Sequence, residues 1–145
     1  MTNRFDGRCH CGNISLVFET ERPIQELGVR ACGCSFCSAR GARTTSDNAG
    51  RVSIEVKDEA ELSRYRFGLM TADFLVCRTC GAYMAAMFTD DDGRAYATLN
   101  TRHFERVAEF PTAGAPVSYA GETAEDKHHR RRKLWTPVAA FRTRG

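Results

Sequence analysis

The sequence predicts an all-β fold whose strands are held together by clustered cysteines. Two observations support this prediction. Short apolar segments with a period of two residues recur at 52–56, 74–77, 83–88 and 95–99, which is the pattern of half-buried strands. All seven cysteines fall into three short clusters, which is more typical of metal ligands than of isolated core residues. A chain of 145 residues is also long enough to bury one hydrophobic core.

The first strand is expected directly after a tight turn around residues 9–13. Ile14, Leu16 and Phe18 alternate with polar residues and would share one face of that strand. Near the other end of the β region, the sequence Asp90-Asp91-Asp92-Gly93 separates the last two apolar runs. Aspartate and glycine favour tight turns, so we expect a hairpin at this point.

The segment after Phe110 differs in composition from the rest. Residues 111–116 contain two prolines and a glycine and predict a connector. The charged segment 122–133 is the candidate for a short C-terminal helix, because Thr123 and Asp126 have the spacing of a helix start.

We therefore divide the chain into a metal-binding domain, residues 1–110, and a connector with a basic tail, residues 111–145. Leu134 and Trp135 bring apolar side chains into this tail. Burying a tryptophan offsets the ordering of a few residues, so we expect the tail to pack on the domain or on a second subunit.

The composition excludes several classes of protein. Hydrophobic residues make up 42% of the chain and charged residues 27%, as in folded globular proteins. The apolar runs are far shorter than a membrane-spanning helix requires. Residues 1–8 are polar and lack the apolar core of a signal peptide, so we expect a cytoplasmic protein in which thiols stay reduced. The net charge of +3 is too small to indicate nucleic-acid binding.

Two of the cysteine clusters predict a closed zinc site. Zinc takes four thiolates in a tetrahedron, and two cysteines spaced closely in one turn supply two of them. Gly12 and Gly81 follow the two pairs and permit the positive φ that such a turn needs. A structural zinc ion would therefore be bound by Cys9, Cys11, Cys77 and Cys80.

The remaining cluster, Cys32, Cys34 and Cys37, supplies only three thiolates. A zinc ion with three protein ligands keeps one coordination position open, which is the feature of catalytic sites. Water, a substrate thiol or a histidine such as His103 could occupy that position. A thiol bound there would become a thiolate nucleophile. Two alternatives stay open: a second structural site completed by histidine, and a group of redox-sensing thiols.

Taken in order, the clusters C-H-C-G at 9–12, C-G-C-S-F-C at 32–37 and C-R-T-C-G at 77–81 resemble the glutathione-dependent formaldehyde-activating enzyme family, which includes centromere protein V. The resemblance extends from Gly7 to Phe104. It implies an Mss4-like zinc fold of coiled antiparallel sheets, with two zinc ions per chain divided as described above. It also implies carbon–sulfur lyase chemistry like that of S-(hydroxymethyl)glutathione synthase, in which a thiol such as glutathione is joined to or split from an aldehyde carbon.

Our leading hypothesis is a zinc-dependent lyase that acts on such a thiol adduct at Cys32, Cys34 and Cys37. Arg40, Arg43 and Arg102 are candidates to hold the substrate carboxylates, because guanidinium pairs bidentately with carboxylate. His103 and Tyr83 are the candidates for acid–base work.

The alternative hypothesis is a zinc-stabilised binding module without enzymatic activity. Its basic run, residues 128–133, would contact nucleic acid or an acidic protein partner. The sequence does not identify the thiol or the aldehyde, and it leaves a homodimer open.

Overall fold

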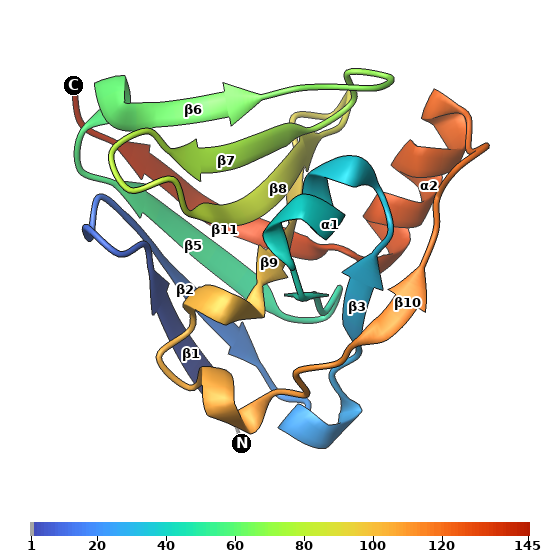
Figure 1. Cartoon of the computed structure of the whole chain (residues 1–145), viewed down its shortest axis with the longest axis horizontal. Coiled ribbons are helices and arrows are strands. Elements are labelled where there is room, and N and C mark those ends of the chain that lie inside the picture. Colours follow the sequence, from blue (N-terminus) through green and yellow to red (C-terminus); the bar gives the residue numbers. More distant parts are fainter. Residues whose placement is uncertain (1) are drawn as a thin grey trace.

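Strands are the predominant regular secondary structure of the protein, as the sequence predicts (Figure 1). The computed structural model describes residues 2–145. Its strands are β1 (Asn3–Arg8), β2 (Ile14–Thr20), β3 (Val29–Cys32), β4 (Thr44–Thr45), β5 (Arg51–Val56), β6 (Leu62–Tyr65), β7 (Asp73–Cys77), β8 (Tyr83–Thr89), β9 (Ala95–Asn100), β10 (Ala115–Val117) and β11 (Thr136–Thr143). The α-helices are α1 (Ser35–Arg40) and α2 (Ala124–Leu134), and the short 3₁₀ helices are η1 (Ile24–Glu26), η2 (Glu59–Glu61), η3 (Thr101–His103) and η4 (Val107–Glu109).

Most neighbouring strands are antiparallel, and β9 connects two parts of the sheet. One path runs β1-β2-β5-β11-β9-β4-β3-β10. A second run, β6-β7-β8, joins this path because β8 also pairs with β9. The strands expected at 14–18, 52–56, 74–77, 83–88 and 95–99 are all present, and the hairpin predicted at Asp90 to Gly93 connects β8 to β9. The all-β fold class is confirmed.

The core lies between β1, β2 and β5 and the strands around β8 and β9. Alternate residues of β2 are buried, and Leu16 and Phe18 lie opposite Ile54 and Val52 in the register with β5. A strand with one buried face fixes its register, because a one-residue shift would expose its apolar side chains. Phe5 completes the cluster, with its ring centroid 5.8 Å from that of Phe18.

The C-terminal strand β11 was not predicted from the sequence. It is parallel to β5, and its first residues, Thr136 and Pro137, pair antiparallel with β9. Its register with β5 shifts between Val138 and Ala140, and Thr136 accepts a hydrogen bond from the backbone N–H of Asp47 at 3.0 Å. The segment beyond residue 110 is therefore continuous with the sheet.

The predicted C-terminal helix is present as α2. It begins with a capping box, in which Thr123 accepts from the backbone of Asp126 and Asp126 accepts from the backbone of Thr123. Two reciprocal hydrogen bonds of this kind satisfy donors that a helix start otherwise leaves free. Within residues 2–145, neither α-helix has the length and apolar character needed to span a membrane.

Trp135, directly after α2, provides a test of how the C-terminal segment packs. Its side chain is 5% exposed and lies in a buried cluster with Phe36, Tyr83 and Phe88. We expect blue-shifted tryptophan emission that acrylamide quenches weakly, and a red shift on unfolding. Because this is the sole tryptophan in the sequence, the signal has one source. Red-shifted, fully quenched emission from the native protein would contradict the packing of this segment.

Candidate metal centres

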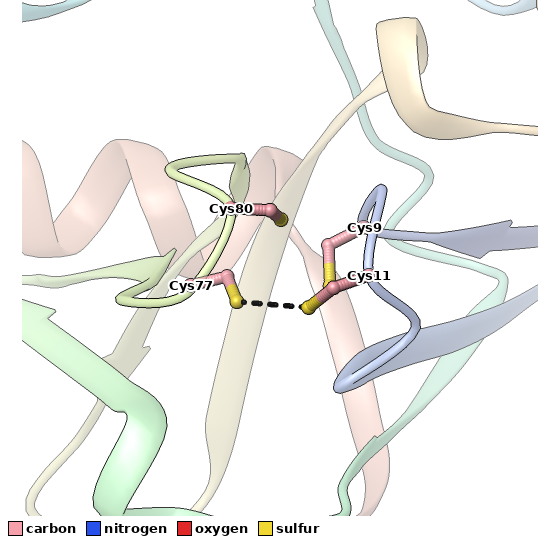
Figure 2. A group of neighbouring side chains, drawn as sticks. All are labelled: Cys9, Cys11, Cys77 and Cys80. Carbon is pink, nitrogen blue, oxygen red and sulfur yellow. Dashed lines mark hydrogen bonds between the residues drawn. The ribbon is translucent and has the colours of Figure 1, made fainter.

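Four cysteines converge from two turns that are distant in sequence (Figure 2). Cys9 and Cys11 lie in the turn between β1 and β2, and Cys77 and Cys80 lie where β7 ends and turns into β8. The two turns have the same local design: the first cysteine donates its N–H to the carbonyl five residues later, at 2.9 Å in one turn and 3.0 Å in the other. Each turn then closes through a glycine with positive φ, Gly12 at 84° and Gly81 at 80°. Only glycine adopts this conformation without strain.

The spacing of the sulfur atoms fits a tetrahedral zinc ion. Zinc–sulfur bonds of about 2.3 Å separate the sulfurs of a tetrahedron by about 3.8 Å. Here the Cys9 and Cys11 Sγ atoms are 3.7 Å apart, and those of Cys11 and Cys77 are 3.5 Å apart. All four sulfurs lie within 4.8 Å of one another, so the group could hold one metal ion.

The electrostatics of this group favour a thiolate at one of its four cysteines, Cys80. Burial acts to raise the pKa of Cys80, but hydrogen bonds from the backbone N–H groups of Cys11 and Ala82 bring it down to about 6. Burial raises the pKa of Cys9 and Cys77. A metal ion would have to supply the attraction that ionises these two buried thiols.

The second group, Cys32, Cys34 and Cys37, surrounds the start of α1. Cys32 ends β3, and Cys34 is the residue that caps α1, where its Sγ accepts from the Cys37 N–H at 3.4 Å. The six-residue helix α1 was not predicted. Its sequence spaces the cysteines as metal ligands and has no apolar face with a helical period. The three sulfur atoms lie within 4.8 Å of one another and could hold a metal ion.

This group is biased towards ionisation at one sulfur. A hydrogen bond from the Cys37 thiol lowers the pKa of Cys32 to about 5. The same contact, together with burial, raises the pKa of Cys37. A thiolate is therefore present near neutral pH, which is the ligand form that zinc requires.

A cavity of about 290 Å³, partly open to solvent, adjoins the three-cysteine group but not the four-cysteine group. Cys32, Cys34 and Cys37 all line it, and so does Tyr83 at the start of β8. Its apolar wall includes Phe67, Leu69, Phe74, Ala86 and Trp135. A site with three ligands thus opens onto a space that a small molecule could fill.

The four residues expected to contact substrate lie elsewhere on the molecule. The described residues that line the cavity do not include Arg40, Arg43, Arg102 or His103. Arg40 stacks on Phe36, with its guanidinium carbon 3.8 Å from the ring centroid. The roles of these four residues stay predictions.

Arg43 also has structural contacts, and His103 is partly buried. The Arg43 guanidinium donates to the carbonyls of Ala42 and Thr112, which ties the connector to the end of α1. His103 is half-buried, and burial together with the neighbouring Arg102 lowers its pKa.

The cations that do line the cavity were missed in the sequence. Arg30 lies two residues before Cys32 on β3, whereas Lys127, Arg130 and Arg131 lie on α2. The spacing i, i+3, i+4 places these three on one face of a helix, which is the signal that could have identified them as a group.

The chain matches a known protein family over most of its length. The family described as glutathione-dependent formaldehyde-activating enzyme matches residues 4–116. The protein belongs to this family.

A Rhodobacter sphaeroides protein of known crystal structure has the same fold. It is 29% identical, with a TM-score of 0.52, and the alignment covers 77% of this chain and 97% of that one. Comparison with curated proteins finds no match. The family match ends before α2 and β11 begin, so the helix that supplies three of the four cavity cations lies outside the matched residues.

Membership of this family and the two cysteine groups predict two zinc ions per chain. The protein purified without chelator should contain close to two equivalents by elemental analysis, because four plus three thiolates use all seven cysteines. Addition of a mild chelator should remove the ion at the three-cysteine group first, since it has fewer protein ligands. Absence of zinc from the purified protein, with the cysteines paired as disulfides, would contradict the assignment.

The two groups should respond differently to the same substitution. Cys80→Ser should prevent stable folding, because the closed group joins segments 66 residues apart and its binding free energy is folding free energy. Cys34→Ser should stay folded, because serine also caps a helix well and the group spans one short segment; we expect a loss of about 1 kcal/mol, or about 4 °C in the melting temperature.

Circular dichroism melts of the two variants measure this difference. If Cys34→Ser melts as early as Cys80→Ser, the three-cysteine group is structural and does not serve as an open site.

Proposed function

We propose that the protein is a zinc-dependent carbon–sulfur lyase that joins a small thiol to an aldehyde, or splits the resulting adduct. The observation that carries this proposal is the incomplete set of three cysteines on the wall of a pocket that is partly open to solvent. A closed four-cysteine group elsewhere in the chain can fulfil the structural role of zinc, so the open group is free for chemistry. The match to the formaldehyde-activating family supports the same reaction class.

The bond changes of the reaction define what the site must provide. Zinc bound at the three cysteines would hold the substrate thiol in its deprotonated, nucleophilic form. The sulfur forms a bond to the aldehyde carbon, the π bond of the carbonyl breaks, and the oxygen takes up a proton to become a hydroxyl. The overall reaction moves the thiol proton to that oxygen, and it runs backwards for cleavage.

Tyr83 is the residue best placed to assist the oxygen. Its side chain is 3% exposed and lines the cavity. Burial, reinforced by the nearby cysteine sulfurs, raises its pKa, so the phenol keeps its proton at neutral pH. A protonated phenol can donate a hydrogen bond to the aldehyde oxygen and stabilise the charge that develops there.

The contacts of α2 count against the alternative function, a basic surface for nucleic acid. Arg131 of the basic run is buried, and Arg130 pairs with Glu122 at 3.0 Å. Arg132 lies 3.7 Å from Asp90, and the His128 ring stacks on Phe88. Most of the run is thus engaged within the protein, whereas nucleic-acid binding requires cations that are free to meet phosphates.

The proposed reaction predicts measurable turnover. Zinc-loaded protein should speed the disappearance of free formaldehyde in the presence of a thiol, and Cys34→Ser should abolish the acceleration while the fold persists. Thiol and aldehyde consumption can be followed together by proton NMR. Equal rates with and without the protein, over a panel of small thiols that includes glutathione, would contradict the lyase assignment.

Tyr83→Phe should lower turnover by about 100-fold, within the range that a positioned proton donor contributes. The ring packing should survive, because phenylalanine keeps the edge contact with Phe36 at a centroid distance of 4.9 Å. Zinc content and melting temperature should therefore match the wild type. Tyr65→Phe serves as the control, since Tyr65 is 48% exposed and lies outside the cavity wall. Equal activity of the Tyr83 variant would remove this residue from the mechanism.

A further inference from the structure

The cavity beside the three-cysteine group has a strong charge asymmetry. Four cations line it, and among the described residues no aspartate or glutamate does. The cations are Arg30, Lys127, Arg130 and Arg131. Buried charges are normally paired, because removing a charge from water without a partner is costly. The partners of these four cations therefore indicate what the cavity is built to receive.

Arg131 is the least satisfied of the four. Its residue is 6% exposed, and its Nη1 donates to Thr71, at 2.7 Å to Oγ1 and at 3.3 Å to the carbonyl. Its Nε is buried without a hydrogen-bond partner, and no carboxylate of residues 2–145 forms an ion pair with it. The guanidinium also lies over the Trp135 ring at 4.9 Å from the centroid. A guanidinium held by neutral groups alone keeps a full positive charge at the cavity wall.

Arg30 is the second cation without an acidic partner. It donates from Nη2 to the hydroxyls of Ser46 and Thr98, at 2.7 and 3.2 Å. Two hydroxyls orient the guanidinium without neutralising it.

The carboxylate of Glu122 neutralises only part of the positive charge of the other two cations, Arg130 and Lys127. It receives two hydrogen bonds from Nε and Nη2 of Arg130, each 3.0 Å long, and lies 3.5 Å from Nζ of Lys127. One carboxylate thus serves two cations. Zinc with three thiolates would contribute a further single negative charge. The four cations still exceed these two negative charges by two.

We propose that Arg30 and Arg131 bind a carboxylate of the substrate, and that α2 thereby restricts the reaction to thiols that carry a negative charge. This inference rests on the proposed function, because the sulfur end of the same molecule would lie at the three cysteines. A deprotonated sulfur and one carboxylate together supply the two missing negative charges. The apolar wall between the two ends, which includes Phe74 and Ala86, suits a short hydrocarbon spacer.

A pair of matched thiols tests the proposal by titration calorimetry on the zinc-loaded protein. The probes are 3-mercaptopropionate and its methyl ester, which differ in charge. Wild-type protein should bind the acid at least about tenfold more tightly than the ester, the effect of one charge-assisted hydrogen-bonded contact. Arg131→Met and Arg30→Met should each bring this preference close to one. Glu122→Gln, which releases Arg130 and Lys127, should increase it.

Arg132→Met is the matched control, because Arg132 is the next residue of α2 and pairs with Asp90 away from the cavity wall. It should keep the wild-type preference. Circular dichroism and Trp135 emission verify that each variant is folded. If Arg131→Met does not fold, Glu122→Gln still tests the proposal independently. Equal binding of acid and ester by the wild type, or a preference unchanged in both Arg30→Met and Glu122→Gln, would overturn the proposal.

Succinate, which has no thiol, separates this proposal from the lyase assignment. Succinate binding that Arg30→Met abolishes, with 3-mercaptopropionate bound no more tightly than succinate, would support the carboxylate site and reject thiol chemistry at the cysteines. Equal binding of both thiols without any binding of succinate would reject the carboxylate site and leave the lyase assignment intact.

Discussion

The convergence of two distant cysteine turns, which a bound metal ion would cross-link, is the constraint on which the rest of the structure depends. It fixes the turn before β2 next to the turn before β8, although the two are separated by 66 residues. β8 begins three residues after Cys80, and its first residue, Tyr83, reaches the cavity. The carbonyl of Tyr83 accepts from Asn100, whose own side-chain oxygen accepts from the backbone of Arg43. Through these contacts, the closed cysteine group positions the strand that faces the open one.

The division of labour between the two groups follows from where each lies. The four-cysteine group does not line the cavity and consists of two turns of the same design, so a metal ion bound there would hold two backbone segments together. The open group draws its ligands from the end of β3 and the first turn of α1, within six residues. A short segment gains little folding free energy from being closed by a metal. It can therefore present a reactive position without endangering the fold.

The parts of the structure that could be predicted are those with a local signal. The spacing of the cysteines and the glycines at 12 and 81 predicts both groups, and the alternation in β2, β5 and β8 predicts the strands. β11 escaped prediction because Pro137 and a register shift break its alternation, and because its partners are more than 30 residues away. The sequence analysis placed the cations for substrate binding at Arg40, Arg43 and Arg102, and that role stays a prediction. The cavity instead takes its cations from β3 and α2, which only the tertiary fold brings together.

The proposed function requires that four cysteines bind one zinc ion and that the other, bound by three cysteines, keeps one coordination position open. Zinc K-edge X-ray absorption measures the mean number of sulfur neighbours per zinc. We expect about 3.5 sulfurs per zinc in the loaded protein, with a lighter atom as the fourth ligand of the open zinc ion, and an increase to about 4 when a small thiol is added. A value of 4 before any thiol is added, or no change on its addition, would contradict an open site.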